Sequence, residues 1–183
     1  MNNVEEITIE ESGMIFGKYS KNQIFYVEKS EQYTKSLCRK GIKTCEFILQ
    51  RGKKLLVVEA KSSCPKQLTK SIPNNDWEMR KAKYDDFISE IVLKMRHTLS
   101  LYGNILLKRH SQKDVPKNLL NTDLSQIQII LLLVINPPNG TWKPDPELQD
   151  VLRKKLQSEI KLWNVNSLIV INAETARKKQ LIL

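Results

Sequence analysis

Residues 45–61 constrain the fold most tightly, because they read as a β-hairpin whose second strand is apolar until it ends in an acid and a base. Side chains alternate between the two faces of a strand, so Glu59 and Lys61 lie on one side, together with Leu55 and Val57. A carboxylate and an ammonium at the end of a buried strand are unfavourable unless they are paired, solvated or bound to a metal. The pattern therefore predicts a functional site at this strand end.

The hairpin register decides whether a second acid joins that site. Arg51-Gly52 is the natural turn, since glycine supplies a positive φ. The pairs that follow are Leu49 with Lys54, Glu46 with Val57, and Thr44 with Glu59. Glu46 then shares a face with Glu59 and lies diagonal to it, with Cα atoms about 7–8 Å apart. A slip of one residue would turn Glu46 to the other face.

We accordingly expect the side chains of Glu46, Glu59 and Lys61 to converge in one open cleft. If they point to different faces, or if Glu59 is sealed in the core against an arginine, a catalytic interpretation fails.

An acid on one strand, a short turn and an apolar strand ending in Glu-x-Lys together resemble the PD-(D/E)xK nuclease superfamily. The resemblance covers residues 43–63. It implies that Glu59 and Lys61 match the (D/E)xK element and that Glu46 stands where the aspartate belongs. Cys45 replaces the proline of the motif, and glutamate replaces the aspartate. A further upstream acid is common in that family, and Glu28 is the best-placed candidate, with Glu31 as the second.

The resemblance implies a divalent metal, Mg²⁺ or Mn²⁺, held by Glu46 and Glu59, and a lysine that assists the attacking water. Elementary chemistry agrees with this. A carboxylate-bound Mg²⁺ neutralises charge on a phosphate and lowers the pKa of its water. It prefers oxygen ligands and keeps several waters, so two carboxylates and a substrate suffice. Lys61 adds positive charge where negative charge accumulates in the transition state.

The charge balance points to a polyanionic partner. Among 183 residues, 30 are Lys or Arg and 20 are Asp or Glu, a formal net charge of +10. This basic excess suits nucleic acid, although a general role in solubility is the alternative explanation. Candidate phosphate contacts lie on two predicted helices: Arg80, Lys81, Lys83, Arg153 and Lys154. Such contacts give affinity without sequence information.

Cysteine usage and hydropathy indicate a cytoplasmic protein. Cys38, Cys45 and Cys64 are an odd set without metal-ligand spacing, as expected for reduced thiols. The N-terminus is polar and shows no signal-peptide pattern. The longest strongly apolar run, Ile129 to Ile135, is too short to span a membrane.

The predicted element order is short N-terminal strands, the hairpin, a long helix, a strand, a second helix and a strand. Helical spacing of apolar residues begins near Asp76, the expected N-cap, and Glu90 and Lys94 are spaced as an i,i+4 pair. Residues 127–135 read as a central strand, residues 108–125 as a loop, and Pro146 begins a helix that runs to about Trp163.

These elements predict an α/β fold: a mixed sheet with an antiparallel N-terminal meander and flanking helices. We expect one domain over residues 1–183, with N-terminal strands in 1–42 and the core in 43–183. The order matches a restriction-endonuclease-like core, as the resemblance implies.

Two functions remain open. The first is a metal-dependent nuclease, with DNA favoured over RNA as the substrate. The second is a non-catalytic module of the same fold that binds nucleic acid or a protein, in which Glu59 and Lys61 form only a strand-end salt bridge. Superfolds host many functions, so the fold alone cannot decide. A nuclease domain this small is expected to depend on a homodimer or a partner protein.

Overall fold

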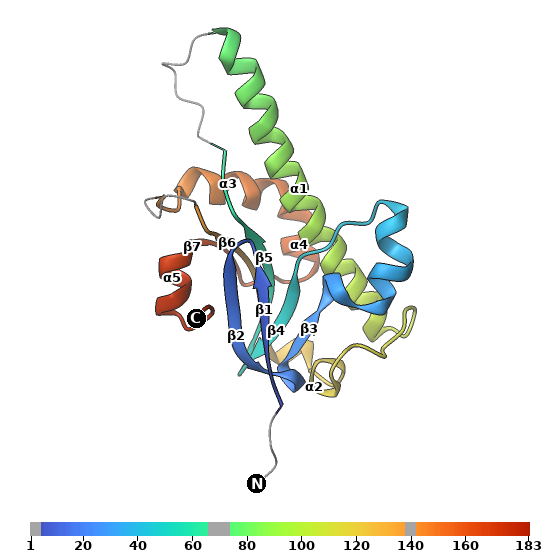
Figure 1. Cartoon of the computed structure of the whole chain (residues 1–183). Coiled ribbons are helices and arrows are strands. Elements are labelled where there is room, and N and C mark those ends of the chain that lie inside the picture. Colours follow the sequence, from blue (N-terminus) through green and yellow to red (C-terminus); the bar gives the residue numbers. More distant parts are fainter. Residues whose placement is uncertain (1–4, 66–73, 138–141) are drawn as a thin grey trace.

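A five-stranded mixed sheet forms the centre of the molecule in the computed structural model, which describes residues 5–65, 74–137 and 142–183 (Figure 1). The strand order is β3-β4-β5-β6-β7. Its strands are β3 (Ile24–Tyr26), β4 (Phe47–Arg51), β5 (Lys54–Lys61), β6 (Gln128–Ile135) and β7 (Ser167–Asn172). The first three strands are antiparallel, and β6 and β7 run parallel to β5. The predicted mixed α/β class is confirmed.

The β4–β5 hairpin turns at Gly52-Lys53, one residue later than predicted. Gly52 has a φ of 57°, in the left-handed region that glycine adopts at no steric cost. Arg51 therefore pairs with Lys54, and Phe47 pairs with Val58. The predicted pairs were wrong by two residues. Because a shift of two preserves the face of every side chain, Glu46 still shares a face with Glu59.

One face of the sheet is covered by helices. They are α1 (Asn74–Leu106), α3 (Pro146–Lys155) and α4 (Gln157–Leu162). Ile91 and Met95 of α1 pack with Leu55 and Val57 of β5 in one apolar cluster. The helix α1 begins at Asn74, so Asp76 lies in its first turn and is not the N-cap. The single helix predicted from Pro146 to Trp163 is divided at Leu156.

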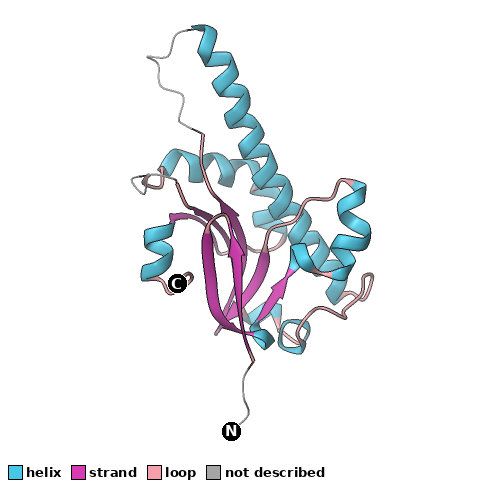
Figure 2. Cartoon of the chain, in the orientation of Figure 1, coloured by secondary structure: helices cyan, strands magenta, loops and turns pink. Residues whose placement is uncertain are grey.

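The opposite face is covered by β1 (Glu6–Glu11), β2 (Met14–Ser20) and α5 (Ala173–Lys178), so the fold has three layers (Figure 2). The strands β1 and β2 form a separate two-stranded sheet. The predicted N-terminal meander was therefore wrong for these two strands, and only β3-β4-β5 is a meander. The reason is packing, since Phe16 of β2 lies edge-on to Phe47 with ring centroids 5.2 Å apart.

Short helical segments fill several connections. A helix, α2 (Lys117–Leu120), and a 3₁₀ turn, η5 (Leu124–Gln126), occupy the region predicted as a loop. The chain between β2 and β4 contains η1 (Lys21–Gln23), η2 (Val27–Lys29), η3 (Tyr33–Leu37) and η4 (Cys38–Lys40).

The three cysteines are free thiols. Within the described ranges, no helix combines the length and the apolar character that crossing a bilayer requires.

Candidate active site

The three predicted acids lie at one end of the central sheet. Glu59 is near the end of β5, and Glu46 directly precedes β4. The hairpin register ends with Phe47 opposite Val58, and the Glu46 amide, one residue earlier, donates to the Val58 carbonyl at 3.0 Å. Glu28 lies in η2, and its amide donates to the Glu46 carbonyl at 3.3 Å. Backbone pairing thus brings together acids that are far apart in the sequence.

Lys94 of α1 reaches into the middle of these acids. Its Nζ lies 3.0 Å from Glu28 Oε1 and 3.0 Å from Glu59 Oε1. It also lies 3.5 Å from Glu46 Oε1. The ammonium therefore supplies the positive charge nearest to all three carboxylates.

Lys61 lies at the edge of the same cluster. Its Nζ is 3.3 Å from Glu59 Oε1 and 2.8 Å from Glu90 Oε1. The predicted i,i+4 pairing of Glu90 with Lys94 is replaced, because the two side chains go to different partners. Lys61 keeps 19% of its side chain exposed, whereas Glu59 is fully buried, so Lys61 is the more accessible of the two.

Burial and charge act in opposite directions on these groups. Burial raises the pKa of Glu59 to about 7, although Lys94 and Lys61 oppose that rise. Burial and the nearby Glu59 carboxylate raise the pKa of Glu46 well above its ordinary value. Burial would lower the pKa of Lys94, but the surrounding carboxylates outweigh it and hold that pKa above normal. The cluster therefore favours a cation at its centre.

The open cleft that we expected lies beside the acids and not around them. Glu46 and Glu59 are both buried. A cavity of about 690 Å³ borders Glu90, the partner of Lys61, between the segment after β5 and helix α1. Lys43 and Lys83 line it as well. A polyanion in this cavity would meet Lys43 and Lys83, and Lys61 adjoins the cavity through its partner Glu90.

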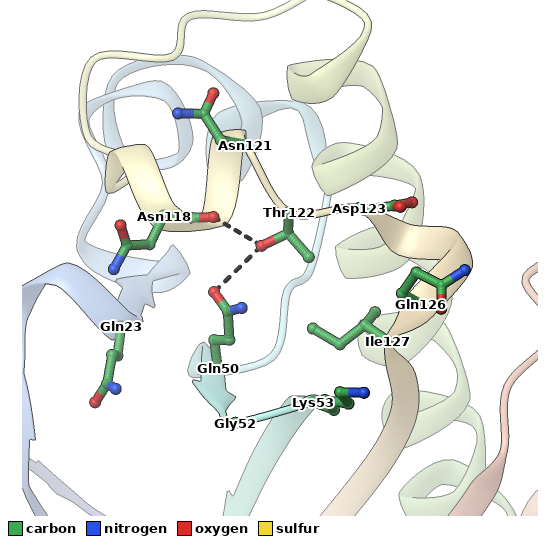
Figure 3. Close-up of a pocket in the computed structure, with 10 residues that line it drawn as sticks. All are labelled: Gln23, Gln50, Gly52, Lys53, Asn118, Asn121, Thr122, Asp123, Gln126 and Ile127. Atoms are coloured by element: carbon green, nitrogen blue, oxygen red, sulfur yellow. Dashed lines mark hydrogen bonds between the residues drawn. The ribbon is translucent and has the colours of Figure 1, made fainter.

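A second cavity lies at the other end of the β4–β5 hairpin and is unrelated to the acids. It measures about 500 Å³ and is lined mainly by amide side chains (Figure 3). There Thr122 donates a hydrogen bond to the Asn118 carbonyl at 2.7 Å and lies 3.2 Å from Gln50 Oε1. Asp123 is the sole carboxylate among the residues that line it, so the paired acids needed for metal chemistry are missing there.

Helix α1 also fixes the backbone next to Glu46. The Thr98 hydroxyl accepts a hydrogen bond from the Cys45 amide at 2.7 Å and donates one to the Lys94 carbonyl at 2.8 Å. Thr98 is fully buried. This link ties Lys94 and Glu46 to one another through the main chain.

The predicted phosphate-binding residues are dispersed. Arg80 lies 3.8 Å from Asp76, and Lys81 lies 3.0 Å from Asp85, so both are paired along α1. Of the five, Lys83 is the one found among the described residues that line the cavity beside Glu90. Arg153 and Lys154 are exposed on α3.

Glu31, the second upstream candidate, pairs with Lys35 and Lys113 instead of joining the acids.

From the sequence, Glu90 and Lys94 were expected to pair with each other along the helix and were not assigned to the site, and Glu11 was missed. Glu11 ends β1, and the Tyr26 hydroxyl donates a hydrogen bond to it. One carboxylate oxygen from each of Glu11, Glu28 and Glu46 lies within 4.8 Å of the other two, an arrangement able to hold a metal ion. Lys94 had a detectable signal, because it interrupts the apolar stripe of α1. Glu11 had none, since its neighbours in space come from other strands.

Comparison of the chain with protein-family models, with curated proteins and with solved structures gives no match. The geometry of the acidic cluster is therefore the basis on which a function can be proposed.

Proposed function

We propose that the chain is a metal-dependent nuclease that hydrolyses phosphodiester bonds, with DNA favoured over RNA, on a restriction-endonuclease-like core. One observation carries the proposal: Glu28, Glu46, Glu59 and Lys61 belong to one connected cluster at one end of the sheet. The element order from the hairpin onward is also that of the core expected from the resemblance.

The donor set fits a hard divalent cation. All candidate ligands are carboxylate oxygens, which Mg²⁺ and Mn²⁺ accept readily. The Glu46 Oε2 atom is buried and finds no hydrogen-bond partner in the described part of the chain, as expected of an oxygen that lacks its ligand. When bound, such an ion would neutralise phosphate charge and acidify a water.

The protein's own residues have separate roles in this proposal. Lys61, at the exposed edge, would donate hydrogen bonds to the phosphate and add positive charge as the transition state forms. Glu59 would hold Lys61 in place from the buried side. Lys43 and Lys83 would contact the nucleic-acid backbone along the adjoining cavity.

The decisive experiment is a digest of plasmid, linear duplex DNA, single-stranded DNA and RNA by the purified chain in Mg²⁺, Mn²⁺ or EDTA. We expect cleavage that requires metal and is lost in Glu59→Ala and Lys61→Ala. Removing one preorganised charge of this kind lowers such rates by about 10²–10³-fold. Glu10→Ala and Lys18→Ala remove the same charges from exposed positions of β1 and β2, and should cleave normally. Equal activity in all four variants would exclude this site.

A non-catalytic module that binds nucleic acid or a protein is the second candidate, and one observation favours it. Glu59 is sealed in the core against Lys94 and Lys61, so the protein already provides its own cations. The digest separates the candidates. Binding that weakens with salt, without cleavage in any metal, would favour the module.

A further inference from the structure

Three carboxylates from three separate elements meet beside Lys94. Glu11 comes from the end of β1, Glu28 from η2, and Glu46 from the residue before β4. Their nearest oxygens lie within 4.8 Å of one another. Three oxygens at that limiting spacing lie about 2.8 Å from their common centre, so a closure of a few tenths of an ångström brings them to calcium-like ligand distances, and a further closure would suit Mg²⁺ or Mn²⁺.

Glu46 provides the second observation. Its side chain is only 5% exposed, and its Oε1 atom faces Lys94 at 3.5 Å. Its other oxygen, Oε2, is buried and has no hydrogen-bond partner in the described part of the chain. A buried acceptor without a donor is unfavourable, and a cation held between Glu46 and its neighbouring acids would satisfy this oxygen.

The local charge balance points the same way. The acids of the cluster are Glu11, Glu28, Glu46, Glu59 and Glu90, and the bases in contact with them are Lys61 and Lys94. Lys61 pairs with Glu59 and Glu90, and among the described residues Glu11 forms no salt bridge. The negative charge is therefore least compensated around Glu11.

Tyr26 fixes the orientation of Glu11. Its hydroxyl, at the end of β3, donates to Glu11 Oε1. Ligating carboxylates are commonly held by an outer hydrogen bond of this kind.

We infer that Glu11 completes a divalent-cation site with Glu28 and Glu46, positioned by Tyr26. The motif of residues 43–63 assigns the ion to Glu46 and Glu59, and the inferred site replaces the sealed Glu59 by a residue of the N-terminal hairpin. The inference builds on the proposed function by naming the ligands of its metal, yet its test measures ion binding and not cleavage.

The experiment is calorimetric titration of the full chain with Mn²⁺ alone, without nucleic acid. We expect Glu11→Gln and Glu28→Gln each to weaken Mn²⁺ binding by about tenfold or more, because ligand charge sets affinity. Glu10→Gln is the matched control, since it makes the same change at the exposed neighbouring residue of β1 and should bind as the unaltered chain does. Glu59→Gln should retain the site.

Two outcomes overturn the inference: Mn²⁺ affinity unchanged in Glu11→Gln, or affinity lost in Glu59→Gln but not in Glu11→Gln. If Glu11→Gln does not fold, Glu11→Asp keeps the charge and shortens the reach, and the same loss of affinity is expected. Terbium luminescence gives an independent readout, because Tyr26 adjoins the ion and Tyr26→Phe should reduce the sensitised emission.

Failure of the inference and failure of the proposed function are distinguishable. Ion binding lost in Glu11→Gln, with no cleavage by the unaltered chain, supports the site and ends the nuclease proposal. Cleavage that persists in Glu11→Gln with unchanged Mn²⁺ affinity overturns the site and leaves the nuclease standing.

Discussion

Lys94 carries a positive charge into a part of the molecule that is otherwise apolar or acidic. Its Nζ lies 3.0 Å from carboxylate oxygens of both Glu28 and Glu59. Removing one partner of a buried ion pair is more damaging than replacing both, because the remaining charge has neither water nor a counter-ion.

We therefore expect Lys94→Met to lower the free energy of unfolding by about 3–5 kcal/mol, measured by urea denaturation in EDTA. Lys83→Met, an equal substitution at an exposed position of the same helix, should change it by no more than about 0.5 kcal/mol. The double variant Lys94→Met with Glu59→Gln should recover part of the loss, because it also removes the stranded charge. A small effect of Lys94→Met would mean that the three contacts contribute little to stability.

At the residue scale, the site residues that could be predicted from the sequence were those that the alternation of side chains along a strand reveals. Glu59 and Lys61 stand out because they end an apolar strand, and Glu46 follows from their face. Lys94 belongs to a helix that packs on that face, so its partners depend on a helix–sheet packing angle that no local pattern encodes. Glu11 depends on where a separate hairpin docks, which local patterns leave undetermined too.

Thr98 of helix α1 makes a polar link to the segment that precedes strand β4. Its buried hydroxyl accepts from the Cys45 amide, directly before Glu46, and donates to the Lys94 carbonyl. The link fixes the position of α1 along its axis relative to Glu46, because it joins the Cys45 amide to the Lys94 carbonyl.

Thr98→Val keeps the side-chain shape and removes the acceptor of the Cys45 amide. We expect the free energy of unfolding to fall by about 1–3 kcal/mol, the usual effect of a buried donor left unsatisfied. Mn²⁺ affinity should fall as well, since Glu46 loses its anchor. Thr8→Val, on an exposed face of β1, should be nearly neutral in both measurements. An unchanged Thr98→Val protein would show that packing alone positions Glu46.

At the element scale, periodicity located β4, β5, β6 and the long helix, and the turn paired β4 with β5, but no local pattern paired β5 with β6 or β6 with β7. The turn moved by one residue because Gly52, with its positive φ, is the first turn residue. The hairpin β1–β2 is not part of the predicted meander, because its buried aromatic residues pack against the second face of the central sheet. Helix α5 was missed since a charged run, Arg177-Lys178-Lys179, hides its two buried alanines, Ala173 and Ala176.

Across the whole molecule, a net charge of +10 coexists with a cluster that is locally acidic. Long-range attraction of a polyanion and local affinity for a cation are therefore separate properties of different surfaces. Lys43 and Lys83, which line the cavity beside Glu90, are where the two surfaces meet.

Binding of a fluorescently labelled duplex by Glu59→Gln, measured by anisotropy in EDTA, should weaken linearly with the logarithm of salt concentration. Lys43→Ala and Lys83→Ala should each reduce that salt slope by about one and weaken binding to all sequences alike. Lys18→Ala, exposed on β2 and not among the residues described as lining the cavity, should leave the slope unchanged. A slope insensitive to Lys43 and Lys83 would place the polyanion on another face.

The contact between Lys94 and Glu59 has a consequence for how the hairpin folds. If β5 slipped past its neighbours by one position, Glu59 would turn toward Phe16 and Phe47, and Lys94 would face aliphatic carbon on β5. Glu59 would then be buried without its counter-ion, and Lys94 would keep only Glu28 and Glu46, so the incorrect alignment is penalised. The Lys94 ammonium therefore favours the observed register of β5, in addition to any part it has in chemistry.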